Sequence, residues 1–242
     1  MRRWAAIVLL FLTTVVLAQD SSIVRSKWRI GASGIVGAGY RQLVSDGSST
    51  YNGTLIALRD DLEEPAPVFG GGVDVTFDLS PHWSLASGPQ FLDLGYRTDR
   101  MPVVSVDPEE VDPTLAESGR INYHYQYMSL PLLVRYRIGS GRFQFEPALG
   151  VAGDLLLDAY TVIELFGPDG LEDLERNSAP YEELRRMTIS AVGELNLHYH
   201  MGRRWELRLA PQARYQAMVL SDTPISDRLY TGGLTLGCMF RL

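Results

Sequence analysis

The last fourteen residues constrain the fold more than any other part of the chain. In residues 229–242, LYTGGLTLGCMFRL, apolar side chains occupy every second position from Leu234 to Leu242, and small or polar residues stand between them. A period of two is typical of a β-strand with one apolar face. A free apolar edge would be prone to aggregation in a soluble sheet, whereas the closing strand of a membrane barrel pairs with the first strand and faces lipid. The segment therefore predicts such a closing strand.

The first eighteen residues have the pattern of a secretory signal peptide. Arg2 and Arg3 precede an apolar run, and Val16, Leu17 and Ala18 offer small or aliphatic residues before a cleavage site at Gln19. A membrane-anchoring helix would need about 20 apolar residues, and this run is shorter. We expect residues 1–18 to be cleaved and residues 19–242 to form one barrel domain.

Charge and cysteine content narrow the possible partners. The formal net charge is −7, and removal of the two arginines of the leader would make it −9. An acidic chain without a basic stretch is a poor candidate for nucleic-acid binding.

The single cysteine, Cys238, has no second thiol in the chain with which to form a disulfide. Because it lies on the apolar face of its strand, we expect it to serve as a small apolar residue of the barrel wall.

Hydrophobic alternation predicts an all-β chain that forms an eight-stranded antiparallel up-and-down transmembrane β-barrel. Most candidate strands are longer than the five or six residues usual in soluble sheets. The expected strands are residues 27–40, 67–79, 82–97, 121–138, 142–157, 186–201, 204–219 and 229–242.

The connections between these strands alternate strictly between short and long. Tight turns are expected around 80–82, 139–141 and 202–203, and long connections at 41–66, 98–120, 158–185 and 220–228. Short periplasmic turns and long extracellular loops are typical of outer-membrane barrels. We expect a β-bulge near Gly88-Pro89, where the third strand breaks phase, and a short helix within 171–186 as the only helical segment.

Aromatic residues gather at both ends of the expected strands. Amphipathic rings prefer the two membrane–water interfaces, so two girdles are predicted. The ring at the short-turn end contains Trp28, Trp83, Tyr136, Trp205 and Phe240, and the ring at the long-loop end contains Tyr40, Tyr96, Tyr215 and Tyr230.

The polar face of the strands carries charges of both signs. An eight-stranded barrel is just wide enough for its own side chains, and buried charges must be paired. We therefore predict an internal network of arginine–carboxylate pairs that holds the barrel rigid and blocks it as a channel. Its expected members are Arg29, Asp74, Asp78, Arg135, Arg137, Glu146, Asp154, Glu194, Glu206, Arg208, Arg214 and Arg241.

Few residues suggest catalysis. His198 and His200 lie on the same face of a strand and could hold a metal. No third ligand stands at a spacing that would complete the site, so we expect both histidines to be hydrogen-bonded inside the barrel. Some small outer-membrane barrels modify lipid A with a His–Ser pair, for which His124 with Ser129, and His198 with Ser190, are the candidates. We predict no catalytic, metal or cofactor site.

The long connections are acidic. The acids could bridge divalent cations to lipopolysaccharide, although charge that keeps hydrated loops soluble is the favoured interpretation. They are Asp60, Asp61, Glu63 and Glu64 in the first, Asp107, Glu109, Glu110 and Asp112 in the second, and Glu172, Asp173 and Glu175 in the third.

The segment 123–157 contains the run Leu130-Pro131-Leu132-Leu133, then Tyr136-Arg137, Gly139, and Pro147 with Gly150. In these features it resembles the PorT-like outer-membrane β-barrel family common in Bacteroidetes. Residues 237–242 are similar to the family's closing strand, but the last residue is Leu242 and not phenylalanine. The resemblance implies the fold, an outer-membrane location and insertion by the barrel-assembly machinery. It implies no shared catalytic residues.

The sequence favours a non-enzymatic integral outer-membrane protein whose loops contact a surface partner or the lipopolysaccharide layer. The alternatives are a PorT-like subunit of a secretion or envelope assembly, a narrow porin for small solutes, and a lipid A-modifying enzyme. The predicted charge-filled interior disfavours the porin.

Overall fold

A computed structural model describes residues 27–49, 51–102, 117–139, 141–167, 170–178 and 184–242. The predicted signal peptide, residues 1–18, lies outside these residues, as do Asp107, Glu109, Glu110 and Asp112 of the second acidic connection.

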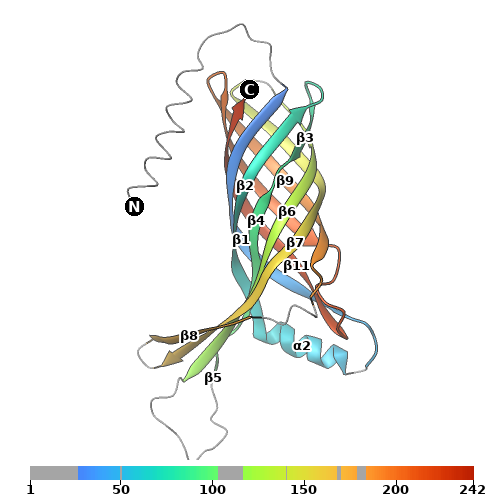
Figure 1. Cartoon of the computed structure of the whole chain (residues 1–242), viewed down its shortest axis with the longest axis vertical. Helices are drawn as coiled ribbons and strands as arrows, with labels where there is room; N and C mark the ends of the chain where they lie inside the picture. The colour runs from blue at the N-terminus through green and yellow to red at the C-terminus, as the bar shows by residue number, and fades with distance from the viewer. Residues whose placement is uncertain (1–26, 50, 103–116, 140, 168–169, 179–183) are drawn as a thin grey trace, which may run out of the picture.

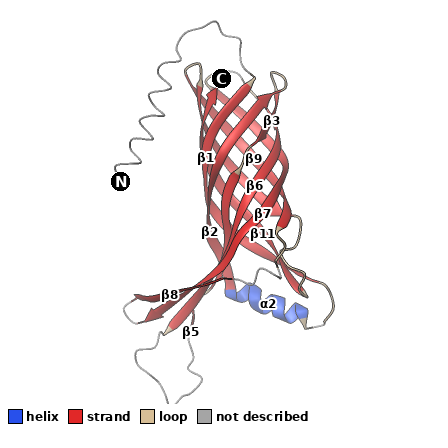
Figure 2. Ribbon diagram, in the orientation of Figure 1, coloured by secondary structure: helices blue, strands red, loops and turns tan. Residues whose placement is uncertain are grey.

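Within the described residues, eight antiparallel wall strands close into a ring (Figures 1 and 2). The first strand pairs with the last, from Arg29 opposite Arg241 to Ser45 opposite Ile225, and this pairing closes the barrel. The predicted eight-stranded antiparallel barrel is therefore confirmed. The wall strands are β1 (Trp28–Ser45), β2 (Glu63–Asp78), β3 (Trp83–Ser87) continued by β4 (Gln90–Thr98), β6 (Ser118–Tyr136), β7 (Phe143–Gly167), β9 (Met187–Met201), β10 (Trp205–Gln216) and β11 (Ile225–Arg241).

The third wall strand is interrupted at Gly88-Pro89, but the predicted bulge is wrong. Val75 lies opposite Ser87 before the break and Gly72 lies opposite Gln90 after it, so pairing resumes in the same register with no extra residue. Pro89 has no N–H for the ladder, yet its carbonyl accepts a hydrogen bond from the Val73 N–H at 3.0 Å. The inward and outward positions therefore keep the same parity through β3 and β4.

One rim of the barrel carries the tight turns. Gly139, Gly141 and Gly202 have φ values of 88°, 107° and 79° there, a conformation that glycine adopts without a Cβ penalty. The start of β1 and the C-terminus lie at this same rim (Figure 1).

The opposite rim carries additional structure. The helix α2 (Asn52–Leu62) lies in the first long connection, where no helix was expected. Among the described residues, no helix is long and apolar enough to cross a membrane. The helix predicted within 171–186 is wrong over its first part: residues 171–178 belong to β8 (Gly170–Ser178), because they form a ladder with the extended end of β7.

Part of the sheet extends beyond the barrel at this rim. The short strand β5 (Met101–Pro102) pairs with the start of β6, and β8 pairs with the end of β7. We call residues 100–102, 118–122, 159–167 and 170–178 the projecting ribbon. It leaves the barrel sideways (Figure 1).

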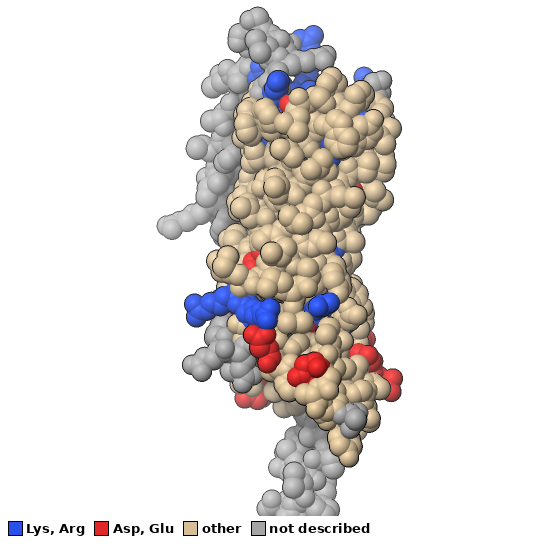
Figure 3. Space-filling view, turned by 90° about the vertical axis from the view of Figure 1, so that its right-hand side faces the viewer, with Lys and Arg blue, Asp and Glu red and all other residues tan. Residues whose placement is uncertain are grey.

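The outer surface of the wall is apolar between its ends. Leu149 is 74% exposed and Leu130 58%, while neighbouring inward residues are buried. Figure 3 shows one face on which the middle of the wall has few charged side chains, while charged side chains lie toward both ends. Exposed apolar side chains over a whole wall indicate a surface that contacts lipid.

Candidate functional site

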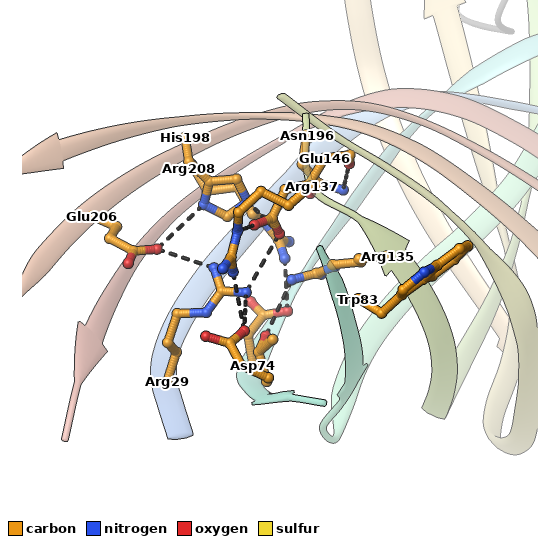
Figure 4. Close-up of polar contacts among 12 residues, drawn as sticks. Arg29, Asp74, Trp83, Arg135, Arg137, Glu146, Asn196, His198, Glu206 and Arg208 are labelled. Atoms are coloured by element: carbon orange, nitrogen blue, oxygen red, sulfur yellow. Dashed lines mark hydrogen bonds and ion pairs between the residues drawn. The ribbon is translucent and has the colours of Figure 1, made fainter. Parts of the chain in front are cut away.

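Strand alternation brings charged side chains from distant segments into the barrel interior. On β1, β7 and β10, inward positions carry Arg29, Glu146 and Glu206, which are all at most 2% exposed. Arg29 donates hydrogen bonds to Glu206 at 3.1 Å and to Glu146 at 3.4 Å, and also to Asp78 of β2 at 3.0 Å. One buried guanidinium thus joins carboxylates from three other strands (Figure 4).

Further cations surround this centre at the short-turn end. Arg137 pairs with Glu146 at 2.6 Å and with Asp78 at 3.0 Å, and Arg241 pairs with Glu206 at 3.0 Å. The ring of His198 lies between the two glutamates, with Nε2 3.4 Å from Glu146 and Nδ1 3.6 Å from Glu206. The carboxylates therefore share several cations, which is the arrangement that buried charge requires.

Separate ion pairs fill the next levels of the interior. Arg208 pairs with Asp74 at 3.1 Å. Arg135 pairs with Glu194 at 3.2 Å and donates a second hydrogen bond to the hydroxyl of Thr76 at 3.2 Å.

A further ion pair in the interior joins β10 to β7. Arg214 donates hydrogen bonds to Asp154 at 2.6 Å and to the hydroxyl of Ser129 at 2.9 Å, and Ser190 donates to the other oxygen of Asp154. With this pair, each of the twelve charged residues predicted to line the interior makes an ion pair with another member of the set, among the residues described.

Toward the long-loop end the interior is apolar and aromatic. Tyr96, Tyr125 and Tyr127 are buried there, with aliphatic neighbours that include Leu92 and Leu94. Tyr96 was predicted to lie in the outer aromatic girdle, and this is wrong: it is 1% exposed and stacks on Tyr123 at 4.6 Å inside the barrel. Even-numbered residues point inward in both β3 and β4, because the alternation of the strand continues unchanged through Gly88-Pro89. Tyr96 is one of these even-numbered residues.

A second ion-pair cluster closes the mouth beneath α2. Buried Arg41 pairs with Glu63 and, at 3.2 Å, with Asp60, while Arg59 of α2 pairs with Glu63 at 2.9 Å and with Asp227 at 3.7 Å. Burial disfavours the charge of Arg59, but its pKa is raised because Tyr96, Asp227 and Glu63 together outweigh that effect.

The alternation of the strands carries a signal for both the aromatic layer and the mouth cluster, which lie beyond the predicted charge network. Arg41 is an even number of positions from Arg29 on the same strand, and Tyr125 and Tyr127 share the parity of Ser129. Three acids of the first long connection have structural partners: Asp60 and Glu63 belong to the mouth cluster, and Glu64 lies 3.3 Å from both Arg97 and Arg120.

The aromatic residues of the short-turn rim pair across neighbouring strands on the outer surface. Trp28 contacts Phe77 at 4.7 Å between ring centroids, and Trp83 contacts Tyr136 at 4.8 Å. Around the rest of the ring, Phe143 pairs with Tyr199 at 4.9 Å and Trp205 with Phe240 at 5.0 Å.

The opposite rim carries the other predicted tyrosines. Tyr40 meets Tyr230 edge to face at 5.9 Å. The hydroxyl of Tyr215 donates to Gln42 at 2.8 Å. Tyr215 and Tyr230 are exposed, at 37% and 41%.

The candidate catalytic pairs are not assembled. His124 lies on the outer face, where it contacts Asp93 at 3.1 Å, whereas Ser129 is buried inside. Ser190 and His198 both face inward but stand eight positions apart on β9, about 26 Å along an extended strand. No group of three or more His, Cys, Asp or Glu residues in the described part of the chain is placed to hold a metal ion.

Solved structures with a similar arrangement are bacterial outer-membrane barrels. Neisserial surface protein A is 10% identical, with 90% of this chain and 98% of that chain covered and a TM-score of 0.43. The attachment invasion locus protein Ail of Yersinia pestis is 13% identical over 89% and 99%, with a TM-score of 0.39. The outer membrane protease OmpT of Escherichia coli is 8% identical over 93% and 99%, with a TM-score of 0.46.

No protein-family model and no curated protein matches the chain. The similarities to solved structures assign no specific family, and the ring itself follows from this chain's own strand pairing. Over its described residues, the protein forms a closed eight-stranded antiparallel β-barrel with an apolar outer wall and a charged interior.

Proposed function

We propose that this protein is a non-enzymatic integral protein of the bacterial outer membrane, in which a closed barrel anchors an extracellular surface for contact with lipopolysaccharide or a partner. The observation that carries the proposal is the combination of an apolar outer wall and an interior filled by ion pairs and tyrosines. In this orientation the tight turns are periplasmic, and α2 and the projecting ribbon are extracellular.

The filled interior favours an anchor over a pore. Three layers lie across the axis: the charge network around Arg29, the aromatic layer around Tyr96 and Tyr127, and the mouth cluster of Arg41 and Arg59. The interior of an eight-stranded barrel is narrow enough for its own side chains to fill, and these three layers occupy it along its length.

Planar-bilayer recording tests this proposal. We expect the purified full-length protein to insert without a steady conductance, while a porin recorded in the same bilayer conducts. Insertion is checked with a spin label at Leu195→Cys on the outer wall, in a Cys238→Ser background. In vesicles prepared in parallel, the accessibility of this label to oxygen shows whether the wall faces lipid. A large, steady conductance from inserted protein would contradict the anchor and favour the narrow porin.

The absence of enzymatic activity is likewise a proposal. It is supported by the separation of His124 from Ser129 and of His198 from Ser190. Mass spectrometry of lipid A from cells with and without the gene should give identical spectra. A mass difference that depends on the gene would favour the lipid-modifying enzyme.

The PorT-like resemblance supports a second proposal, a subunit of an envelope or secretion assembly. The resembling residues form the β6–β7 hairpin of the wall. This hypothesis predicts co-purification with other envelope proteins from gently solubilised membranes, and loss of secreted cargo on deletion. Barrel purified alone under those conditions, with normal secretion from the deletion strain, would contradict it.

A further inference from the structure

The projecting ribbon continues the two faces of the barrel wall. Outward positions of β6, such as Arg120, pair with Glu164 and its neighbours on β7, and these pair with Leu174 and its neighbours on β8. The ribbon leaves the barrel sideways (Figure 1), and we call the face that continues the outer wall its membrane-side face. The face that continues the inner wall is its opposite face.

The membrane-side face of the ribbon is amphipathic. Leu171 and Leu174 are 54% and 56% exposed on it. Two arginines lie over its aromatic rings: the Cζ atom of Arg176 is 3.7 Å from the ring centroid of Tyr160, and the Cζ atom of Arg100 is 3.6 Å from the ring centroid of Phe166. Rings and leucines with guanidinium groups above them are typical of a surface at the boundary between acyl chains and headgroups.

The opposite face of the ribbon has a different character. Its positions on β8 carry Asp173, Glu175 and Asn177, which lie across from Leu165, Ile163 and Thr161 of β7. The described side chains of β8 thus place their acids on one face and their leucines and arginine on the other. The membrane-side face also carries two acids of β7, Glu164 and Asp158, beside Arg100, Arg120 and Arg176. An anionic membrane surface would attract this face more than the opposite one, where the charged side chains of β8 are acids.

We propose that the face of the ribbon bearing Leu171, Leu174, Arg100 and Arg176 docks on the outer leaflet of the membrane, with its arginines bound to the phosphates of anionic lipid headgroups. Arg176 also pairs with Asp158 at 3.0 Å, but its side chain is 59% exposed, which leaves N–H donors for a phosphate. Arg120, near the base of the ribbon, shares Glu64 with Arg97, so two guanidinium groups there meet one carboxylate. This inference rests on the membrane insertion proposed above.

Spin labels on adjacent residues of the ribbon test the docking. In the Cys238→Ser background of the full-length protein, Leu174→Cys reports the membrane-side face and Asp173→Cys the opposite face. Each labelled protein is reconstituted into phosphatidylcholine vesicles with and without phosphatidylglycerol, and access to oxygen and to a water-soluble nickel chelate is measured. The Leu195→Cys label on the wall reports barrel insertion separately.

We expect the Leu174 label to be shielded from the nickel chelate, most strongly in anionic vesicles, while the Asp173 label stays accessible. Each arginine near an anionic surface should change the ratio of docked to free ribbon about fivefold, so Arg100→Gln with Arg176→Gln should reduce it strongly. Arg203→Gln at the other rim is the matched control and should leave it unchanged.

Equal nickel access at positions 173 and 174 in anionic vesicles, with a lipid-exposed Leu195 label, would overturn the docking while leaving insertion intact. Shielding of Leu174 that the two arginine substitutions leave unchanged would overturn the role of the headgroup phosphates. A water-exposed Leu195 label would contradict the proposed function itself.

Discussion

At the scale of single residues, Arg29 organises the interior at the short-turn end. It is completely buried and meets three carboxylates from three strands, so its removal would leave Asp78, Glu146 and Glu206 with fewer cations. Loss of one partner from a buried ion pair is strongly destabilising because the remaining charge keeps its desolvation cost. Arg29 therefore stabilises the barrel by neutralising these three carboxylates.

Arg29→Met is predicted to lower the free energy of unfolding by about 3–5 kcal/mol, the cost of a buried charge left without its partner. Urea unfolding of the detergent-refolded barrel, followed by tryptophan fluorescence, measures the change. Arg142→Met, which alters an exposed arginine in a tight turn, should change stability by less than about 0.5 kcal/mol. Equal effects of the two substitutions would show that the network around Arg29 contributes nothing specific.

At the scale of the strands, close packing between β6 and β7 requires glycine at one position of β7 and tolerates a side chain at another. A Cβ added at Gly150 would lie 2.0 Å from the carbonyl oxygen of Leu132, which belongs to the backbone of the neighbouring strand. A Cβ at Gly153 would meet nothing within 4 Å. The two glycines of one strand thus have different structural roles.

Gly150→Ala should destabilise the barrel by about 1–3 kcal/mol, because the backbone of β6 must shift to admit the methyl group. Gly153→Ala on the same strand should be neutral or slightly stabilising, since it only restricts the unfolded chain. Heat-modifiable migration on gels, combined with urea titration, gives both values. The reverse order of the two variants would contradict the β6–β7 register.

At the scale of the whole molecule, the closure of β1 on β11 makes the chain a barrel and not an open sheet. Ala32 lies opposite Cys238 in this pairing, and both lie on the outer side of the wall. Val36 lies opposite Leu234, four positions further along, or about 13 Å from the level of Cys238.

Oxidation of Ala32→Cys is predicted to form a disulfide with Cys238, because opposed residues of paired strands lie within the span of a disulfide. Val36→Cys is the control and should stay reduced, since a disulfide cannot span 7 Å or more between Cα atoms. Mass spectrometry of the cleaved, non-reduced protein identifies the linkage. An open sheet would give no linkage at Ala32→Cys.

Hydrophobic alternation alone was enough to predict eight antiparallel wall strands and to place the twelve network residues on the polar face of those strands. The reason is that a strand has a strict period of two, so one apolar face fixes the direction of every side chain on it. The alternation of residues 204–219 was enough to place Glu206, Arg208 and Arg214 on one face.

The pairing of each arginine with its carboxylate could not be predicted from the sequence, because these partners are up to 177 residues apart and depend on the stagger of the closed ring. The inward direction of Tyr96 also depends on the fold, since unbroken register through Gly88-Pro89 is a property of the neighbouring strands β2 and β6. Likewise, residues 171–178 form a strand because β7 extends beyond the barrel and offers a free edge for pairing, which no local pattern in those residues reveals.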